Sequence, residues 1–383
     1  MKIKKAVALS TVLGVALAGI AFAAPSHADP VSGGYSITGS DTLQDAVNAL
    51  VNGTRITGTL VRVTAGGNSV GNYDATGSTT VQLKSSVGAV GRPSGSGDGK
   101  KSLSRSIDGG NWVKNGITST ITGQVDLARS SDGAGVDANG GLNEPNGPLT
   151  FIPFGRDAVS YAFKFGSGAT LANTPGIDQL TTTQLNAIYG SATPVVLGST
   201  TVVPVLPQSS SGTRKFFLGA IGVAANPAGV PNASTSTTIE NDANVLTPAA
   251  GTVQIIPFSA ASWIAQANGA TAINTTGTVA GVPSTSFLGA IGGVAPFTVA
   301  SASLVPNAAF YSSTVFGRDT YIIAGTAALA SDAALASLVN PSSSTSLTYF
   351  GTSNAPGTSK AVKLKFGFLA PLSTTTFHTN LFS

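Results

Sequence analysis

The feature that most constrains the fold is a repeated unit of an apolar strand, a loop of glycine and hydroxyl residues, and a helix. The unit occurs at residues 33–53, at 87–107 and again at 200–223. A run at 177–190, with hydroxyl residues before apolar positions at helical spacing, predicts one more helix. Strands that alternate with helices in this way predict an α/β chain with mixed central sheets flanked by helices.

The pattern also predicts where individual elements begin. In the first unit the candidate helix N-cap is Ser40, Asp41 or Thr42, and the apolar face is formed by Leu43, Val47, Leu50 and Val51. In the second unit the helix is expected to begin near residues 96–99. Residues 251–269 and 313–326 are strand candidates, and residues 331–339 predict a short helix.

The three loops share one composition. Residues 38–44, 93–101 and 208–216 each follow an apolar strand, precede a helix, and consist largely of residues with a hydroxyl or no side chain. A helix N-terminus exposes unpaired N–H groups and a partial positive charge, while hydroxyls add donors, so such a loop can bind an anion. The same residues also cap helices where no anion binds, so both interpretations stay open for each loop.

The N-terminus predicts export. Lys2, Lys4 and Lys5 precede an apolar run, and small residues follow it, as is typical of a signal peptide over residues 1–28. The full chain has a formal net charge of +4, and the signal would remove three lysines, so the mature charge is close to zero and gives no indication of nucleic acid binding. Cysteine is absent; we therefore expect a secreted or envelope-associated protein without a lipid anchor.

Few residues suit catalysis or metal binding. Beyond the signal the only histidine is His378, and the only glutamates are Glu144 and Glu240. A hydrolase with Ser211 as nucleophile would need a base that its motif does not supply. Scattered aspartates do not have calcium-ligand spacing. We therefore expect a protein that is not an enzyme and that binds no metal or cofactor.

A four-residue match stands outside these units. The letters FGRD occur at 154–157 and again at 316–319, each time at an apolar, β-rich run. The match is too short to be a repeat, but each copy could begin a segment that passes between two lobes.

Four motifs in this order carry a family resemblance. They are GSDT at 39–42, GSGDG at 95–99, VDLARSSD at 125–132 and SSGTRKFF at 210–217. From about Gly34 to Leu372 the chain resembles the phosphate-binding proteins of ABC-type uptake systems, and is similar to their secreted actinobacterial members. The resemblance implies a two-lobed, Venus-flytrap fold. Lobe 1 would comprise residues 29–155 and about 300–383, and lobe 2 about 156–299.

The resemblance also implies a ligand site for inorganic phosphate. The matched positions are Thr42, the Leu43 backbone amide, Ser96, Asp132, Ser211, Gly212 and Thr213, with Ser94 and Ser131 as alignment alternatives. The family has an arginine where this chain has Pro207, and an acidic residue where it has Ser209. Arg129 and Arg214 are nearby cations that could supply the missing charge.

The aspartate has a physical role of its own. A buried carboxylate accepts a hydrogen bond only from an anion that still carries a proton, so Asp132 would admit hydrogen phosphate and repel sulfate. It could equally cap its own loop.

We expect a monomer with an ABC permease as possible partner and no nucleic acid. The alternative is an extracellular surface or matrix protein that keeps this fold without phosphate uptake; its three loops would splay apart.

Overall fold

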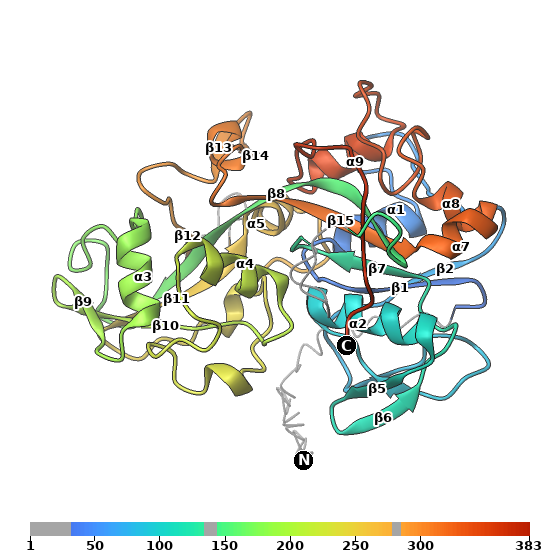
Figure 1. The fold of residues 1–383 in the computed structure, drawn as a ribbon. Coiled ribbons are helices and arrows are strands. Elements are labelled where there is room, and N and C mark those ends of the chain that lie inside the picture. The colour runs from blue at the N-terminus through green and yellow to red at the C-terminus, as the bar shows by residue number, and fades with distance from the viewer. Residues whose placement is uncertain (1–31, 134–143, 278–284) are drawn as a thin grey trace, which may run out of the picture.

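One mixed β-sheet runs through the whole molecule (Figure 1). The computed structural model describes residues 32–133, 144–277 and 285–383, so the predicted signal peptide lies outside the described residues. The main path of the sheet has the order β2-β1-β7-β15-β8-β11-β10-β9, and β12 and β16 pair with β8 beside it. These strands are β1 (Tyr35–Gly39), β2 (Val70–Asn72), β7 (Leu127–Ser130), β8 (Leu149–Phe165), β9 (Val195–Leu197), β10 (Thr200–Pro204), β11 (Thr252–Ser259), β12 (Ser286–Leu288), β15 (Gly317–Gly325) and β16 (Phe377–Thr379).

Helices and small hairpins surround this sheet. The helices are α1 (Gln44–Asn52), α2 (Gly95–Asp108), α3 (Thr182–Gly190), α4 (Gly212–Ala220), α5 (Ala260–Ala267), α6 (Ala308–Tyr311), α7 (Thr326–Ser331), α8 (Ala333–Leu338) and α9 (Ser359–Lys365). Three two-stranded ribbons pair β3 (Thr80–Val81) with β4 (Val90–Gly91), β5 (Asn111–Lys114) with β6 (Ile117–Thr120), and β13 (Phe297–Ala300) with β14 (Ser303–Pro306). Within the described residues no helix is long and apolar enough to cross a membrane.

The 17-residue strand β8 joins the two lobes. Its first part pairs with β15 and β16, and its second part pairs with β11 and β12. Figure 1 shows β8 extending from the strands beside α1 and α2 to those beside α3 and α4. The predicted two-lobed α/β fold is confirmed. The hairpin β13–β14 and helix α6 pack on the second lobe, and the chain returns to the first lobe in β15.

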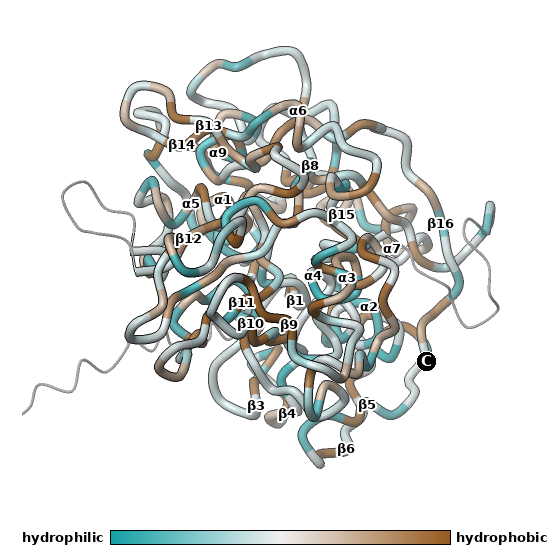
Figure 2. The backbone as a smooth tube through the Cα atoms, turned by 90° about the vertical axis from the view of Figure 1, so that its left-hand side faces the viewer, coloured by the Kyte–Doolittle hydropathy of each residue, from teal (hydrophilic) through white to brown (hydrophobic). Residues whose placement is uncertain are grey.

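Each lobe buries both faces of its part of the sheet, which explains the apolar runs of the strands. In the first lobe Ile152 and Phe154 face a core that includes α1, α8 and α9, whereas Phe151 faces a core that includes Leu103 of α2. In the second lobe the larger core includes α3 and α4, and the smaller one includes Trp263 of α5. Figure 2 shows β10 and β11 as largely hydrophobic stretches of the chain.

The helices agree with the sequence pattern in part. Thr181 caps α3 in a complete capping box, and Leu185, Ile188 and Tyr189 are buried, as predicted. Helix α2 begins at Gly95, one residue before the predicted range. The predicted side-chain caps of α1 are wrong, because its N-cap is Leu43 and no side chain caps the helix.

Helix α5 also corrects the sequence analysis. Residues 251–269 are expected to be a strand, but the strand ends at Ser259 and the chain continues as a helix. The Ser259 hydroxyl accepts a hydrogen bond from the backbone of Ser262, which is the contact of a helix cap. The four alanines of residues 260–267 favour the helix once it is capped.

The two FGRD segments pair with each other where β8 passes between the lobes. Strand β15 runs antiparallel to β8, with Arg318 opposite Asp157 and Asp319 opposite Arg156. Each arginine therefore forms an ion pair with the aspartate opposite it on the other strand. Arg318 Nη2 lies 2.8 Å from Asp157 Oδ2, and Arg156 Nη1 lies 3.0 Å from Asp319 Oδ1.

Candidate functional site

The three hydroxyl-rich loops meet at the junction of the lobes. Thr42, before α1, and Thr213, in the first turn of α4, have their hydroxyl oxygens 3.3 Å apart. The loop before α2 joins them from the other side, since the backbone N–H of Gly97 donates to the carbonyl of Ser210 at 3.0 Å. Convergence of this kind is contrary to the splayed loops that the surface-protein alternative predicts.

Gly212 permits a close approach of the two lobes. A Cβ added to Gly212 would overlap both Ser96 Oγ and Ser131 Oγ. These two serines are themselves hydrogen-bonded, with oxygens 3.2 Å apart, and the Ser131 backbone donates to Ser96 Oγ at 2.9 Å. Ser131, one of the alignment alternatives, therefore lies against the second-lobe loop.

The cluster is buried and rich in donors. Thr42 is 4% exposed, and Ser96, Ser211 and Thr213 are fully buried. The N-termini of α1, α2 and α4 begin beside these residues, so the partial positive charges of three helices reach the same region. A region of this kind can bind an anion with few formal charges.

A positive charge comes from a residue that the sequence analysis did not assign to the site. Arg318 of β15 is 4% exposed, and its Nη2 donates to Thr213 Oγ1 at 2.9 Å and approaches Thr42 Oγ1 at 3.4 Å. Its guanidinium also lies over the ring of Phe216, 5.5 Å from the centroid. Arg318 Nη1 is buried and has no hydrogen-bond partner among the described residues. A buried charged donor without a partner is costly, so an anion that accepts a hydrogen bond from this nitrogen would bind most favourably.

The acidic partner of Arg318 also comes from an FGRD segment. Asp157 is fully buried and accepts two bonds from Arg318 through Oδ2. Its Oδ1 accepts from the Ser259 hydroxyl at 2.9 Å and from the Ala261 backbone at 3.0 Å, at the start of α5. Asp157 therefore fixes the guanidinium of Arg318 to the second lobe.

The side chain of Arg129 does not bond to the hydroxyl cluster. Its guanidinium donates to the carbonyls of Ser40, Gly39 and Tyr73 at 2.8–3.2 Å, and also to Asn72 Oδ1. Burial lowers the pKa of Arg129 to about 10. These contacts tie β7 to the loop that follows β1.

Arg214 faces the opposite end of its loop. Its guanidinium donates to the carbonyls of Pro207, Ala233 and Ala225 at 2.6–2.9 Å. Burial lowers its pKa. The guanidinium groups of Arg129 and Arg214 bond to backbone carbonyls and asparagine side chains, whereas the guanidinium of Arg318 reaches the hydroxyls of Thr42 and Thr213.

Asp132 is held within the first lobe. Lys100 Nζ lies 3.1 Å from Asp132 Oδ1, and the Ser130 hydroxyl donates to the same oxygen at 2.7 Å. Burial by itself would raise the pKa of Asp132, but the charges of Lys100 and Lys215 and these hydrogen bonds outweigh it, so the pKa lies below its usual value. Asp132 is therefore an ionised acceptor next to the Ser131 backbone.

The histidine and serine of the hydrolase alternative belong to different parts of the fold, because His378 is in β16 and Ser211 begins α4. His378 Nδ1 lies 3.1 Å from Thr150 Oγ1 in the first part of β8. Thr150 is seven residues before Asp157 in this strand, which corresponds to about 23 Å. Ser211 instead caps α4, accepting from the Arg214 backbone at 3.0 Å, and donates to Glu240 Oε2. Among the described residues no group of three or more histidine, aspartate or glutamate side chains could hold a metal.

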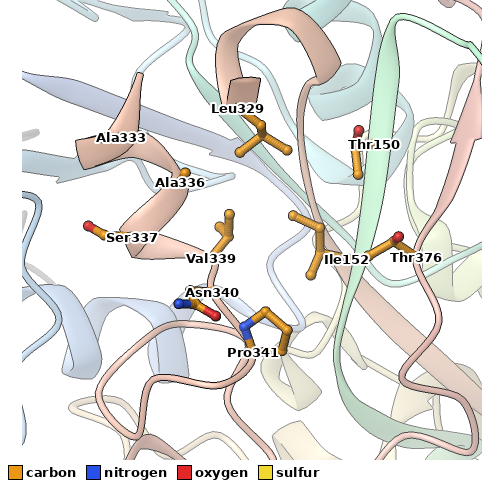
Figure 3. Close-up of a pocket in the computed structure, with 10 residues that line it drawn as sticks. All are labelled: Thr150, Ile152, Leu329, Ala333, Ala336, Ser337, Val339, Asn340, Pro341 and Thr376. Atoms are coloured by element: carbon orange, nitrogen blue, oxygen red, sulfur yellow. The ribbon is translucent and has the colours of Figure 1, made fainter. Parts of the chain in front are cut away.

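A hollow lies on the first lobe, away from the hydroxyl cluster (Figure 3). It has a volume of about 460 Å³ and adjoins a hollow of about 290 Å³ that shares Ile152 and Pro341. The larger hollow is lined by Thr150, Ile152, Leu329, Ala333, Ala336, Ser337, Val339, Asn340, Pro341 and Thr376. None of these residues is charged, so this hollow does not suit an oxyanion.

Comparison with known proteins gives likeness in structure alone. No family model matches the chain, and a search of curated proteins finds no match. Among solved structures it is similar to an ABC-type phosphate transport receptor from Vibrio cholerae, with 14% identity, 88% of this chain and 100% of that chain covered, and a TM-score of 0.46. It is also similar to a phosphate-binding protein from Stenotrophomonas maltophilia, with 13% identity, 89% of this chain and 91% of that chain covered, and a TM-score of 0.47. Similarity to PstS from Borrelia burgdorferi is at 13% identity, with 88% of this chain and 99% of that chain covered and a TM-score of 0.39.

Proposed function

We propose that this chain is a solute-binding protein that holds an oxyanion, most favourably inorganic phosphate, between its two lobes. The observation that carries the proposal is Arg318, a buried guanidinium with one unpartnered nitrogen, among hydroxyls from both lobes. No covalent chemistry is required of these residues. Binding and release are the whole function that they support.

The chemistry of the cluster favours a tetrahedral oxyanion. Guanidinium groups present planar pairs of donors that match two oxygens of one anion. The hydroxyls of Thr42 and Thr213 already point at the same guanidinium, so an anion oxygen placed among them would receive donors from three residues. Arg318 would thereby provide the charge that Pro207 does not.

The number of donors is sufficient for useful affinity. A micromolar dissociation constant corresponds to about 8 kcal/mol. Hydrogen bonds to a charged group contribute about 1.5–3 kcal/mol each, so five or six donors meet this requirement after the entropic cost of association.

Ligand exchange requires the lobes to separate. The cluster is buried on all sides in the closed arrangement, with bonds from lobe to lobe at Thr42, Gly97 and Arg318. The paired FGRD segments lie where β8 passes between the lobes, so we place the hinge there.

Location and partner form part of the same proposal. The basic and apolar character of residues 1–28 supports export. An exported phosphate-binding protein would deliver its ligand to an ABC permease, and we propose that it does so as a monomer.

Removal of one hydroxyl tests the site. Thr213→Val keeps the shape of the side chain but deletes the oxygen that contacts both Thr42 and Arg318. We expect phosphate affinity, measured by isothermal titration calorimetry, to fall about 10- to 100-fold. Thr201→Val on β10, outside the cluster, should bind like the original chain. Absence of heat with phosphate, arsenate and sulfate alike would refute the proposed function.

A further inference from the structure

Two carboxyl groups from opposite lobes meet beside the hydroxyl cluster. Asp41 precedes Thr42 in the first lobe, and Glu240 belongs to a second-lobe loop, where it is 3% exposed. The two side chains are within hydrogen-bonding reach of each other. Asp41 is partly exposed and Glu240 is buried, so two ionised carboxylates here would repel strongly and the pair holds one proton between them.

The surrounding contacts hold the pair in place without neutralising it. The Ser211 hydroxyl donates to Glu240 Oε2, whereas Glu240 Oε1 is buried and receives no hydrogen bond from a nitrogen or hydroxyl of the described residues. Asn241 Nδ2 donates to Asp41 Oδ1 at 3.0 Å and to Thr42 Oγ1 at 3.2 Å. Asn241 is itself fixed in the second lobe, because its Oδ1 accepts from the Ser259 backbone at 2.8 Å.

The charged groups near the pair are mostly engaged elsewhere. Arg318 is paired with Asp157, and Arg129 is surrounded by carbonyls, although the charge of Asp41 acts on it. Asp45 of α1 adds a further negative charge. Burial, followed by the charge and hydrogen bond of Glu240, raises the pKa of Asp41 well above its usual value, against the opposing bond from Asn241.

We infer that Asp41 and Glu240 form a proton-sharing latch between the lobes, so that closure over a ligand takes up one proton. When the lobes separate, both carboxyls reach water and the proton leaves. Acid then favours the closed protein and retention of the ligand, and alkali favours opening and release. The link to ligand retention rests on the proposed function, whereas the latch itself does not.

The sign of the effect on stability follows from linkage. The closed, folded chain binds the shared proton more tightly than the unfolded chain does, so stability falls as the pH rises from the usual carboxyl range towards the raised pKa of Asp41. Asp132 and Asp332 have lowered pKa values and act in the opposite direction, but only at more acidic pH. Comparison of variants between pH 5 and pH 8 therefore reports on the latch.

The test compares the only two glutamates beyond the signal. In phosphate-free buffer, the melting temperature of the unmodified protein is expected to fall between pH 5 and pH 8 by about 3–5 °C more than that of Glu240→Gln. Glu144→Gln, far from the cluster, should follow the unmodified protein. Asp41→Asn should flatten the curve as Glu240→Gln does, and the double variant should add nothing further. Parallel curves for all variants would overturn the latch.

A second measurement connects the latch to the ligand. Calorimetry with phosphate at pH 7.5, in buffers of different ionisation enthalpy, counts the protons taken up on binding. Because the ligand's own ionisation is the same in each titration, the unmodified protein should take up more protons than Glu240→Gln, by about one. Equal counts would overturn the latch. No binding of phosphate by any variant would refute the proposed function, and the melting curves would still decide the latch.

Discussion

Replacement of Arg318 by methionine is expected to abolish phosphate binding, with a loss of at least about 100-fold in affinity. The change removes the only guanidinium that contacts the hydroxyls of Thr42 and Thr213 among the described residues. A hydrogen-bonded charge lost from a buried site costs about 3 kcal/mol or more. Arg318→Lys keeps the charge but not the planar pair of donors, so we expect an intermediate loss. Calorimetric titration with phosphate measures both.

The second FGRD arginine is the matched control. Arg156 occupies the equivalent position in its motif and is also paired with an aspartate, but its other donors reach the carbonyls of Tyr311 and Ser313. Arg156→Met should therefore lower stability while the folded protein still binds phosphate within a few-fold of the original affinity. Retained binding in Arg318→Met would place the anion elsewhere.

Replacement of Asp157 by alanine is expected to lower the free energy of unfolding by about 3–5 kcal/mol. The change leaves the buried charge of Arg318 without its counter-ion and removes the acceptor for Ser259 and Ala261 at the start of α5. Urea unfolding followed by circular dichroism measures the loss.

A double variant separates the two roles of Asp157. In Asp157→Ala with Arg318→Met the unpaired charge is gone, so the stability should exceed that of Asp157→Ala alone, while the lost acceptor for Ser259 and Ala261 at the start of α5 still costs about 1 kcal/mol. The double variant should not bind phosphate, as expected for Arg318→Met alone. Strictly additive losses would show that Asp157 and Arg318 do not interact.

The sequence predicts the helix N-termini at Ser94 and Ser211 because that property is local. Hydroxyl and glycine residues before a helix mark its N-terminus, and Ser211 and Gly212 lie where the pattern places them. Phosphate as ligand, and the role of each site residue in holding it, stay predictions that the binding experiments decide.

The identity of the cationic residue cannot be read in the same way. The 318 position lies 161 residues from its partner Asp157, and only the register of β15 on β8 brings the two together. Arg129 and Arg214 are near the loops in sequence, but residue spacing does not reveal that their guanidinium groups face backbone carbonyls. Glu240 belongs to a loop without a recognisable motif, so only the fold shows its contact with Asp41.

The shared strand β8 has a consequence for the order of folding. The core of the second lobe is built from a continuous stretch, residues 158–316, whereas the first lobe needs β1, β15 and β16 from opposite ends of the chain. Contacts between distant residues form late because their loop-closure entropy is large. The second lobe should therefore become protected from amide hydrogen exchange first during refolding. The first lobe should follow only when β16 (Phe377–Thr379) has paired with Leu149–Phe151 of β8, so truncation before residue 377 should leave that edge of the strand unprotected.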